Sequence, residues 1–275
     1  MNMRRRLLLL AVPALALAVG SWDVPRSLAE PEWYSGLLRV CADPNNMPYS
    51  DRAGEGFENK LAELVAKAMG RRLVYTWWPQ RRGFISHALD RNRCDVLMGV
   101  PQMDTVATTR PYYRSTYVFV TRKDRNLTFS SMKAPELRKL SIGVAMIGND
   151  GWNTPPAHAL AEERIVDNVK GYMVYGDYSQ KDPPARLIRA VEDGEIDIAA
   201  AWGPLAGYFA KVSPVPLRVV PITDTISFLP LSFTYSISMG VRKYDAALQE
   251  ELNEVIIRKR DEIRKLLDSY GVPQV

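Results

Sequence analysis

The chain of 275 residues is predicted to be an α/β protein with two lobes, each a mainly parallel sheet flanked by helices. Three observations support this class. Strand-like and helix-like segments alternate from residue 38 to residue 270, which is typical of parallel strands joined by right-handed crossovers. The strand-like runs are mostly apolar, as expected where helices cover both faces of a sheet. The alternation also occurs twice, with a polar stretch at residues 122–126 between the two copies.

The first copy covers residues 38–121. Apolar residues recur at three- and four-residue spacing from Phe57 to Ala68, so residues 56–69 are predicted to form an amphipathic helix that ends at Gly70. Strands are predicted at residues 38–43, 72–78, 94–100 and 114–121.

The second copy begins after the polar stretch, where the chain is predicted to cross into the second lobe. Residues 232–241 alternate in polarity and are predicted to form the strand that returns to the first lobe. Residues 245–270 are predicted to form one long helix that closes on that lobe. Because the chain crosses twice, we expect a hinge suited to closure on a ligand. The predicted segments are a signal peptide at 1–29, lobe 1 at 30–122, lobe 2 at 123–234 and a return to lobe 1 at 235–275.

The N-terminus has the pattern of a secretory signal peptide. Three arginines precede an apolar run from Leu7 to Val19, and Ser27-Leu28-Ala29 is a small-x-small cleavage site. This pattern predicts a periplasmic protein that does not span the membrane once the peptide is cleaved, since no later segment is long and apolar enough. An uncleaved membrane anchor is the alternative interpretation.

The net charge of +5 comes mostly from this leader. Without residues 1–29, four arginines and one aspartate are lost, which leaves 32 basic against 30 acidic residues. A nearly neutral exported protein has no electrostatic signature of nucleic-acid binding.

The chain has two cysteines, Cys41 and Cys94. An oxidising compartment favours a disulfide. If the two strands are aligned neighbours, however, the sulfurs are offset by about 10 Å at about 3.3 Å per residue, which is too far for a bond. A disulfide and two buried thiols therefore both remain open.

Several short motifs resemble the periplasmic solute-binding proteins that include amino-acid receptors: Gly56-Phe57-Glu58, Cys94-Asp95-Val96 and Pro111-Tyr112-Tyr113, with residues 192–197 in the second lobe. Four longer blocks, at residues 41–49, 56–60, 76–84 and 109–120, resemble the quinoprotein-dehydrogenase-associated periplasmic binding proteins found with methanol oxidation systems. This resemblance implies a type II periplasmic binding-protein fold. It also implies an accessory role in which the chain binds a dehydrogenase dependent on pyrroloquinoline quinone, or its cofactor, and assists its maturation or activation.

Amino-acid receptors of the resembled family hold the ligand carboxylate with an arginine after the third strand of lobe 1 and the amine with an aspartate after a late strand of lobe 2. Here the first position falls within residues 101–106, which contain no arginine, and the second falls at Trp202. Without the charge-assisted contacts of both groups, the chain is not expected to bind a free amino acid.

Ligands of open α/β sheets lie beyond the carboxyl ends of the strands. The cleft residues predicted by this rule are Asp43, Asn45, Tyr49, Trp78, Gln80, Arg81, Gln102, Arg110, Asn149, Asp150 and Trp202. Aromatic, amide and arginine side chains together suit a flat anionic ligand or a loop of a partner.

Other interpretations of nearby residues remain open. Alternation sends either Arg81 or Arg82 to solvent. Trp77, Tyr112 and Tyr113 are expected to pack in the core and the hinge, and residues 148–151 suit a plain turn as well as an anion site.

No enzyme is expected. His87 and His158 are the only histidines, they fall in different lobes, and no Cys or His cluster has metal-ligand spacing, so neither a metal nor a cofactor is expected. The alternative function is a substrate-binding subunit that delivers a small polar or anionic solute to an ABC importer.

Overall fold

The computed structural model describes residues 36–81, 83–147, 153–173 and 178–275. The predicted signal peptide lies outside these residues. Gly36–Val275 form one unit, and no helix in the described part of the chain is both long and apolar enough to cross a membrane.

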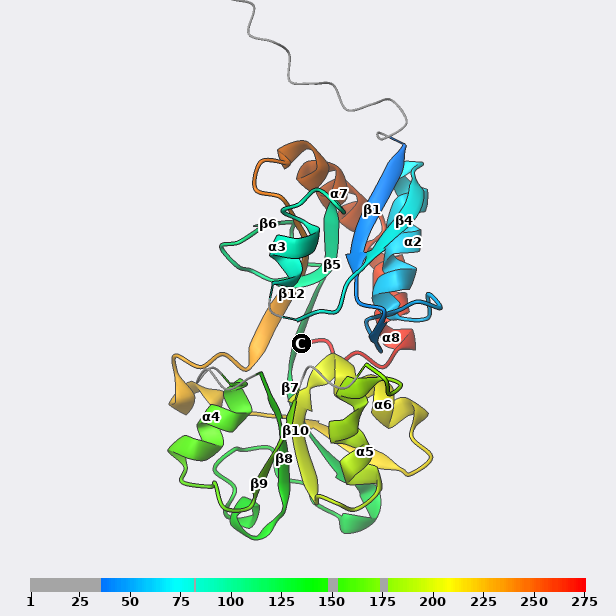
Figure 1. Cartoon of the computed structure of the whole chain (residues 1–275). Coiled ribbons are helices and arrows are strands. Elements are labelled where there is room, and N and C mark those ends of the chain that lie inside the picture. Colours follow the sequence, from blue (N-terminus) through cyan, green and yellow to red (C-terminus); the bar gives the residue numbers. More distant parts are fainter. Residues whose placement is uncertain (1–35, 82, 148–152, 174–177) are drawn as a thin grey trace, which may run out of the picture. The chain divides into compact units, whose positions relative to one another are not determined.

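Lobe 1 contains a sheet in the order β4-β1-β5-β12, with β6 beside β12 (Figure 1). The first three strands run parallel, and β12 is antiparallel to β5. The bounds are β1 Leu37–Ala42, β4 Arg72–Trp77, β5 Val96–Pro101, β6 Ala107–Thr108 and β12 Thr234–Val241. A separate short hairpin is formed by β2 Asn45–Asn46 and β3 Ser50–Asp51.

Helices cover both faces of this sheet. The predicted amphipathic helix is α2 (Phe57–Met69), and Gly70 ends it in the left-handed region at φ 66°, as predicted. A core cluster that includes Phe57, Leu61 and Val65 lies between α2, the sheet and the C-terminal helices. On the opposite face, α3 (Phe84–Ala88) covers a smaller cluster that contains both cysteines.

Lobe 2 has a parallel set of three strands in the order β10-β8-β9, with β7 antiparallel to β10 and β11 on the other edge of β7. One core lies under α5 and α6, and a second lies under α4. The bounds are β8 Ile142–Met146, β9 Val169–Met173, β10 Ile198–Trp202, β11 Leu217–Pro221, α4 Pro155–Glu162, α5 Arg186–Glu192 and α6 Gly203–Val212. Short 3-10 helices are η1 Lys123–Arg125, η2 Pro135–Lys139, η3 Pro183–Ala185 and η4 Thr225–Phe228.

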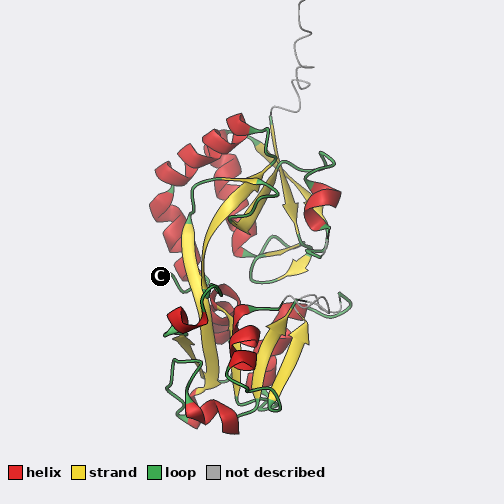
Figure 2. Ribbon diagram, turned by 90° about the vertical axis from the view of Figure 1, so that its left-hand side faces the viewer, coloured by secondary structure: helices red, strands yellow, loops and turns green. Residues whose placement is uncertain are grey.

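Strand β7 (Tyr113–Arg122) belongs to both sheets. Residues 113–116 pair with β12, residues 117–121 pair with β10, and residues 118–122 pair with β11 (Figure 2). The chain therefore changes lobes inside a strand, between Thr116 and Tyr117. The polar stretch at 122–126, where the sequence places the boundary, is instead the far end of β7 and η1, because the composition changes where the strand meets solvent and not where it changes partner.

The C-terminal segment forms two helices, α7 (Ala246–Arg258) and α8 (Arg260–Ser269). The prediction of one helix over 245–270 is therefore wrong. Lys259 interrupts the helix with φ −106° and ψ 13°, and both halves pack against α2. Val255 and Ile256 of α7 and Ile263 and Leu267 of α8 lie in the same core, so the apolar face continues across the interruption.

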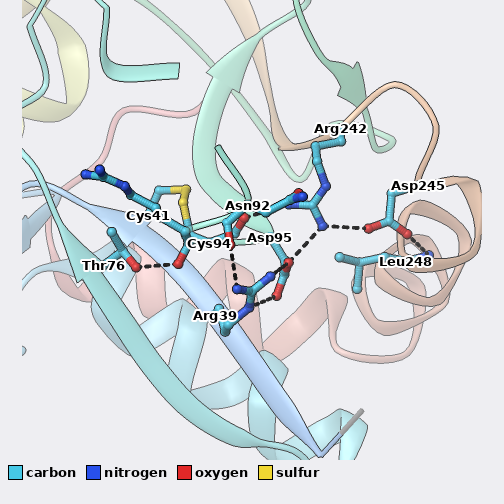
Figure 3. A network of polar contacts seen from close by, with 10 residues as sticks. Arg39, Cys41, Thr76, Asn92, Cys94, Asp95, Arg242, Asp245 and Leu248 are labelled. Carbon is cyan, nitrogen blue, oxygen red and sulfur yellow. Dashed lines mark hydrogen bonds and ion pairs between the residues drawn. A yellow bond between two sulfur atoms is a disulfide. The ribbon is translucent and has the colours of Figure 1, made fainter. Parts of the chain in front are cut away.

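Cys41 and Cys94 form a disulfide with their Cα atoms 5.4 Å apart (Figure 3). The offset expected from aligned strands does not arise, because Cys94 precedes β5, which begins at Val96. The carbonyl of Arg93 accepts a hydrogen bond of 2.6 Å from the hydroxyl of Thr76, and Thr76 is the register partner of Cys41. Residues 93–95 thus turn back beside β1 and bring Cys94 over Cys41.

A buried ion network lies next to the disulfide (Figure 3). The carboxylate of Asp95 accepts from Nε of Arg39 at 2.7 Å and from Nη2 of Arg242 at 2.8 Å. Arg242 also donates to the carbonyl of Cys94 and pairs with Asp245, the N-cap residue of α7. The network therefore links β1, the disulfide, the end of β12 and the start of α7.

Candidate ligand-binding cleft

A cavity of about 490 Å³ lies between the two lobes at the carboxyl ends of β1, β5, β8 and β10. This volume falls within the range of roughly 300–1,000 Å³ that is usual for drug-sized ligands. Lobe 1 contributes polar residues such as Asp43, Glu58 and Gln80, and lobe 2 contributes mainly apolar ones such as Leu187 and Leu205.

Aromatic residues dominate the lining. Six tyrosines and Trp202 face the cavity, and the Trp202 ring meets Tyr117 and Tyr235 edge-to-face with centroids 5.3 Å and 5.8 Å apart. Two of the tyrosines, Tyr172 and Tyr178, donate hydrogen bonds to carboxylates. The tyrosines whose hydroxyls make no hydrogen bond within the described residues are Tyr49, Tyr113, Tyr117 and Tyr235. Burial raises the pKa of each of these four, so they remain neutral phenols that can donate or accept.

Four of the predicted cleft residues line this cavity: Asp43, Tyr49, Gln80 and Trp202. Arg81 lines a second cavity of about 380 Å³ inside lobe 1, which shares Asp43, Glu58 and Gln80 with the first. Asn45 lies at the contact between the lobes.

Three predicted residues lie elsewhere. Trp78 stacks on His87 of α3, with centroids 5.2 Å apart and planes 10° from parallel. Gln102 is exposed outside the cavity, and Arg110 is exposed while its amide donates to Asn253 of α7. The carboxyl-end rule finds the edge of the sheet at which the cavity lies, but it does not tell which side of the backbone each side chain takes. Asn149 and Asp150 lie outside the described residues.

The described parts of the lobes are joined by polar contacts beside the cavity. Tyr178 of lobe 2 donates its hydroxyl to Asp43 of lobe 1, and the guanidinium of Arg81 lies 4.7 Å from the centre of the Tyr178 ring. Asn45 donates to the carbonyl of Gln180 at 2.7 Å and accepts from the amide of Asp182 at 2.9 Å.

Apolar contacts reinforce this junction. Met47 belongs to the lobe 1 hairpin loop, yet it is only 5% exposed because it packs into the lobe 2 core with Leu205 and Phe209. Tyr270, after α8, stacks on Tyr208 of α6 with centroids 5.8 Å apart. These contacts hold the lobes together while the cavity remains between them.

Comparison with known proteins now identifies the family. Residues 38–273 match the model of the bacterial extracellular solute-binding proteins, family 3. The chain belongs to this family.

Within the family, the chain resembles a small group of proteins along most of its length. It is 32% identical to Protein MoxJ of Methylorubrum extorquens over 96% of this chain and 89% of that protein. The crystal structure of the periplasmic binding protein XoxJ from Methylobacterium extorquens AM1 is 36% identical, covers 86% of this chain and 99% of its own, and superposes with a TM-score of 0.72. The structure of MxaJ from Methlophaga aminisulfidivorans MPT gives 29% identity, the same share of this chain, all of its own and a TM-score of 0.75. These matches confirm the predicted resemblance and the predicted fold.

Glu58 is a charged residue of the cavity lining that the sequence rule missed. Its carboxyl group lies against Gly99, where a Cβ atom would be 2.1 Å from Oε1. Burial and then the nearby charge of Asp43 raise the pKa of Glu58 to about 8. Glu58 lies in the first turn of α2 and does not follow a strand, so the carboxyl-end rule does not select it. The signal was present in the motif Gly56-Phe57-Glu58, which served only to indicate the family.

The lining of the cleft provides groups that can bind a ligand. Among the residues that the structure describes, no group of three or more His, Cys, Asp or Glu side chains could hold a metal ion. Of the segments compared above with an amino-acid clamp, residues 101–106 contain no arginine and Trp202 presents an aromatic ring to the cavity. The remaining lining offers aromatic faces, hydroxyl groups and two carboxyl groups.

Proposed function

We propose that this chain is a periplasmic accessory of a quinoprotein alcohol-dehydrogenase system, and that it assists maturation or activation of the enzyme by holding a segment of it in the interlobe cavity. Similarity to MoxJ, XoxJ and MxaJ along most of the chain supports the assignment, as do the four sequence blocks typical of dehydrogenase-associated binding proteins. The disulfide and the predicted signal peptide support a periplasmic location.

The observation that carries the proposal is an aromatic cavity held between lobes that are already joined. A receptor for a small solute gains its affinity by closing charged groups around the ligand. Here Met47 and the Asp43–Tyr178 hydrogen bond join the lobes, while about 490 Å³ remains between them. The tyrosine and tryptophan lining suits an inserted protein segment, because these two residue types are enriched where proteins bind proteins.

The lining also favours a protein segment over an anionic quinone cofactor. None of the described residues that line the cavity is Lys, Arg or His, whereas Asp43 and Glu58 are acidic. An anionic ligand would therefore find no opposite charge among these residues and two carboxyl groups nearby.

The test is capture of the dehydrogenase by the mature chain, residues 30–275. The immobilised chain is exposed to the quinoprotein alcohol dehydrogenase of the same bacterium, with and without its cofactor, and both capture and the rate of activation are measured. Trp202→Ala should reduce both, because its ring forms part of the cavity wall. Tyr244→Ala is the matched control, since Tyr244 is 76% exposed and outside the cavity. Absence of capture and of activation by the unsubstituted chain rejects the proposal.

Membership of the extracellular solute-binding family favours a second candidate, a substrate-binding subunit of an ABC importer. This role requires tight binding of a small polar or anionic solute together with closure of the lobes. Calorimetry against organic acids and common nutrients, paired with solution scattering, separates the two functions. A saturable fall in radius of gyration on binding a nutrient supports the importer subunit and rejects the accessory.

A further inference from the structure

The two carboxyl groups of the cavity differ in how they are satisfied. Asp43 is 2% exposed, and its carboxylate accepts from the amide of Asn45 at 2.8 Å, from the amide of Gln80 at 2.6 Å and from the hydroxyl of Tyr178. These three donors compensate its charge. Asp43 is therefore occupied in joining the lobes.

Glu58 has no such compensation. Its carboxyl group makes no hydrogen bond or ion pair with any described residue, although it borders both the interlobe cavity and the cavity inside lobe 1. The backbone fixes its position, because the amides of Phe57 and Glu58 donate to the carbonyls of Pro48 and Tyr49 at 2.8 Å and 2.9 Å. Gly99 leaves the space that the carboxyl group occupies.

The groups that face Glu58 supply no positive charge. Asp43 lies beyond β1, Tyr49 lies in the hairpin loop, and Tyr112 and Tyr113 lie at the start of β7. Arg81 and Asp90 border the lobe 1 cavity that Glu58 shares, and the guanidinium of Arg81 is directed to the Tyr178 ring. A half-buried carboxyl group without a partner is costly to ionise, and this desolvation, followed by the nearby charge of Asp43, raises the pKa of Glu58.

Aromatic faces around an unpaired carboxyl group are a favourable environment for an organic cation. The ring quadrupole attracts ammonium and guanidinium groups, and the attraction increases where water is excluded. Tyr113, Tyr117 and Trp202 line the same cavity as Glu58, and none of the described lining residues competes with a cation of its own.

We propose that the interlobe cavity binds an alkylammonium or guanidinium group, which pairs with the Glu58 carboxylate and lies against the tyrosine and tryptophan rings. This inference rests on the proposed function, since it names the chemical group of the dehydrogenase segment that enters the cleft, a lysine or arginine side chain. A free amine offers the same group.

Binding is measured by titration calorimetry and by the fluorescence of the mature chain. The probes are N-acetyl-lysine methylamide and N-acetyl-arginine methylamide as peptide side chains, agmatine as a free amine, N-acetyl-norleucine methylamide as the neutral isostere and glutarate as an anion. Both cationic peptide analogues should bind at least about tenfold more tightly than the neutral isostere, as expected for a charge-assisted contact. Equal affinity of the neutral isostere, or tighter binding of glutarate, overturns the proposal.

Proton release gives a second readout. At pH 7 the Glu58 carboxyl group is mostly protonated, so a cation that pairs with the carboxylate must displace a proton. Calorimetry in two buffers with different ionisation enthalpies should detect this proton. The affinity should fall as the pH decreases from about 8 to about 6, by up to about tenfold per pH unit. Binding without proton release and without pH dependence contradicts the role of Glu58.

The variant Glu58→Gln should lose at least about tenfold in affinity for the cationic probes. It should fold, because the amide replaces a protonated carboxyl group of the same shape, and circular dichroism checks this. Glu63→Gln is the matched control: it removes an acid from the same helix α2, where Glu63 pairs with Lys60 at the surface. Equal affinity of the two variants for the cations overturns the proposal.

Capture of the dehydrogenase tests the proposed function, and binding of the cationic probes tests the cation site, so the two can fail independently. If the chain captures the enzyme but binds no cationic probe, the cation site is rejected and the accessory role stands. If capture succeeds and N-acetyl-lysine methylamide competes better than agmatine, the cation belongs to a protein segment. Preferential competition by agmatine assigns the site to a free amine.

Discussion

Lobe 1 and lobe 2 share an architecture but differ in how their charges are arranged. In lobe 1, the disulfide and the Arg39–Asp95–Arg242 network lie in the interior, and Asp43 and Glu58 bring carboxyl groups to the cleft. In lobe 2, ion pairs such as Arg122–Asp124 and Arg186–Glu195 lie at the surface, and the cleft wall is mainly apolar and aromatic. The difference teaches that lobe 1 supplies the polar groups of the candidate site, and that lobe 2 supplies mainly apolar and aromatic ones.

The largest difference in stability between a lobe 1 variant and its lobe 2 counterpart should appear when the buried ion network of lobe 1 is broken. Asp95→Ala leaves the guanidiniums of Arg39 and Arg242 buried without their carboxylate, so we expect a loss of about 3–5 kcal/mol in the free energy of unfolding. Denaturant titration measures it. Asp124→Ala in lobe 2 is the counterpart, and because its pair with Arg122 is exposed to solvent, its loss should leave the unfolding midpoint almost unchanged. Equal losses would show that burial does not distinguish the lobes.

Removal of the disulfide is expected to have the next largest effect. The bridge closes a loop with a sequence separation of 53, and the double variant Cys41→Ala, Cys94→Ala should lose about 2–4 kcal/mol of stability. Unfolding with and without a reducing agent checks this: reductant should destabilise the unsubstituted chain and leave the variant unchanged. Equal sensitivity of both proteins to reductant would contradict the assignment.

Disruption of the junction between the lobes should cost less stability than loss of the ion network or of the disulfide. Met47→Ala leaves a cavity in the lobe 2 core, so the free energy of unfolding should fall by about 2 kcal/mol. Because Met47 joins the lobes, the variant should also allow them to separate. Solution scattering should report a larger radius of gyration for this variant. Met173→Ala serves as control, because Met173 is 51% exposed. An unchanged radius would mean that the remaining junction contacts suffice.

The smallest effect is expected at Glu58, and it should depend on pH. The folded pKa of about 8 lies above the unfolded value of about 4.3, so the stability that the protonated group contributes is complete below about pH 4 and is lost as the pH rises to about 8. Glu58→Gln removes this dependence. Relative to it, the unsubstituted chain should lose about 1 kcal/mol between about pH 6 and 8, less than the limiting value because water in the cavity screens the charge. Parallel stability curves for the two proteins would exclude the shift.

Much of the fold is encoded locally. Helix α2 follows its apolar spacing and ends at Gly70, because only a residue without a side chain adopts φ 66° at little cost. The break at Lys259 was not predictable from the same kind of pattern, since the apolar stripe continues through it. The disulfide depended on the backward turn of residues 93–95, which strand spacing does not reveal.

The sequence predicted the edge of the sheet at which the candidate site lies, but it did not predict which side chains face the cavity. Asp43, Tyr49, Gln80 and Trp202 face the cavity, as their positions beyond strand ends indicate. Trp78 follows a strand end in the same way, yet its ring stacks on His87 of α3 and does not line the cavity. Tyr113 is both a core residue and part of the cavity wall, so the expectation that it packs in the hinge describes only one of its contacts.

The double membership of β7 has a consequence for how the protein unfolds. Its backbone amides are held by β12 at one end and by β10 and β11 at the other, so neither half can lose its sheet without exposing part of the same strand. We therefore expect the two halves to melt in a single cooperative transition, with amides at the centre of β7 among the last to exchange with deuterium.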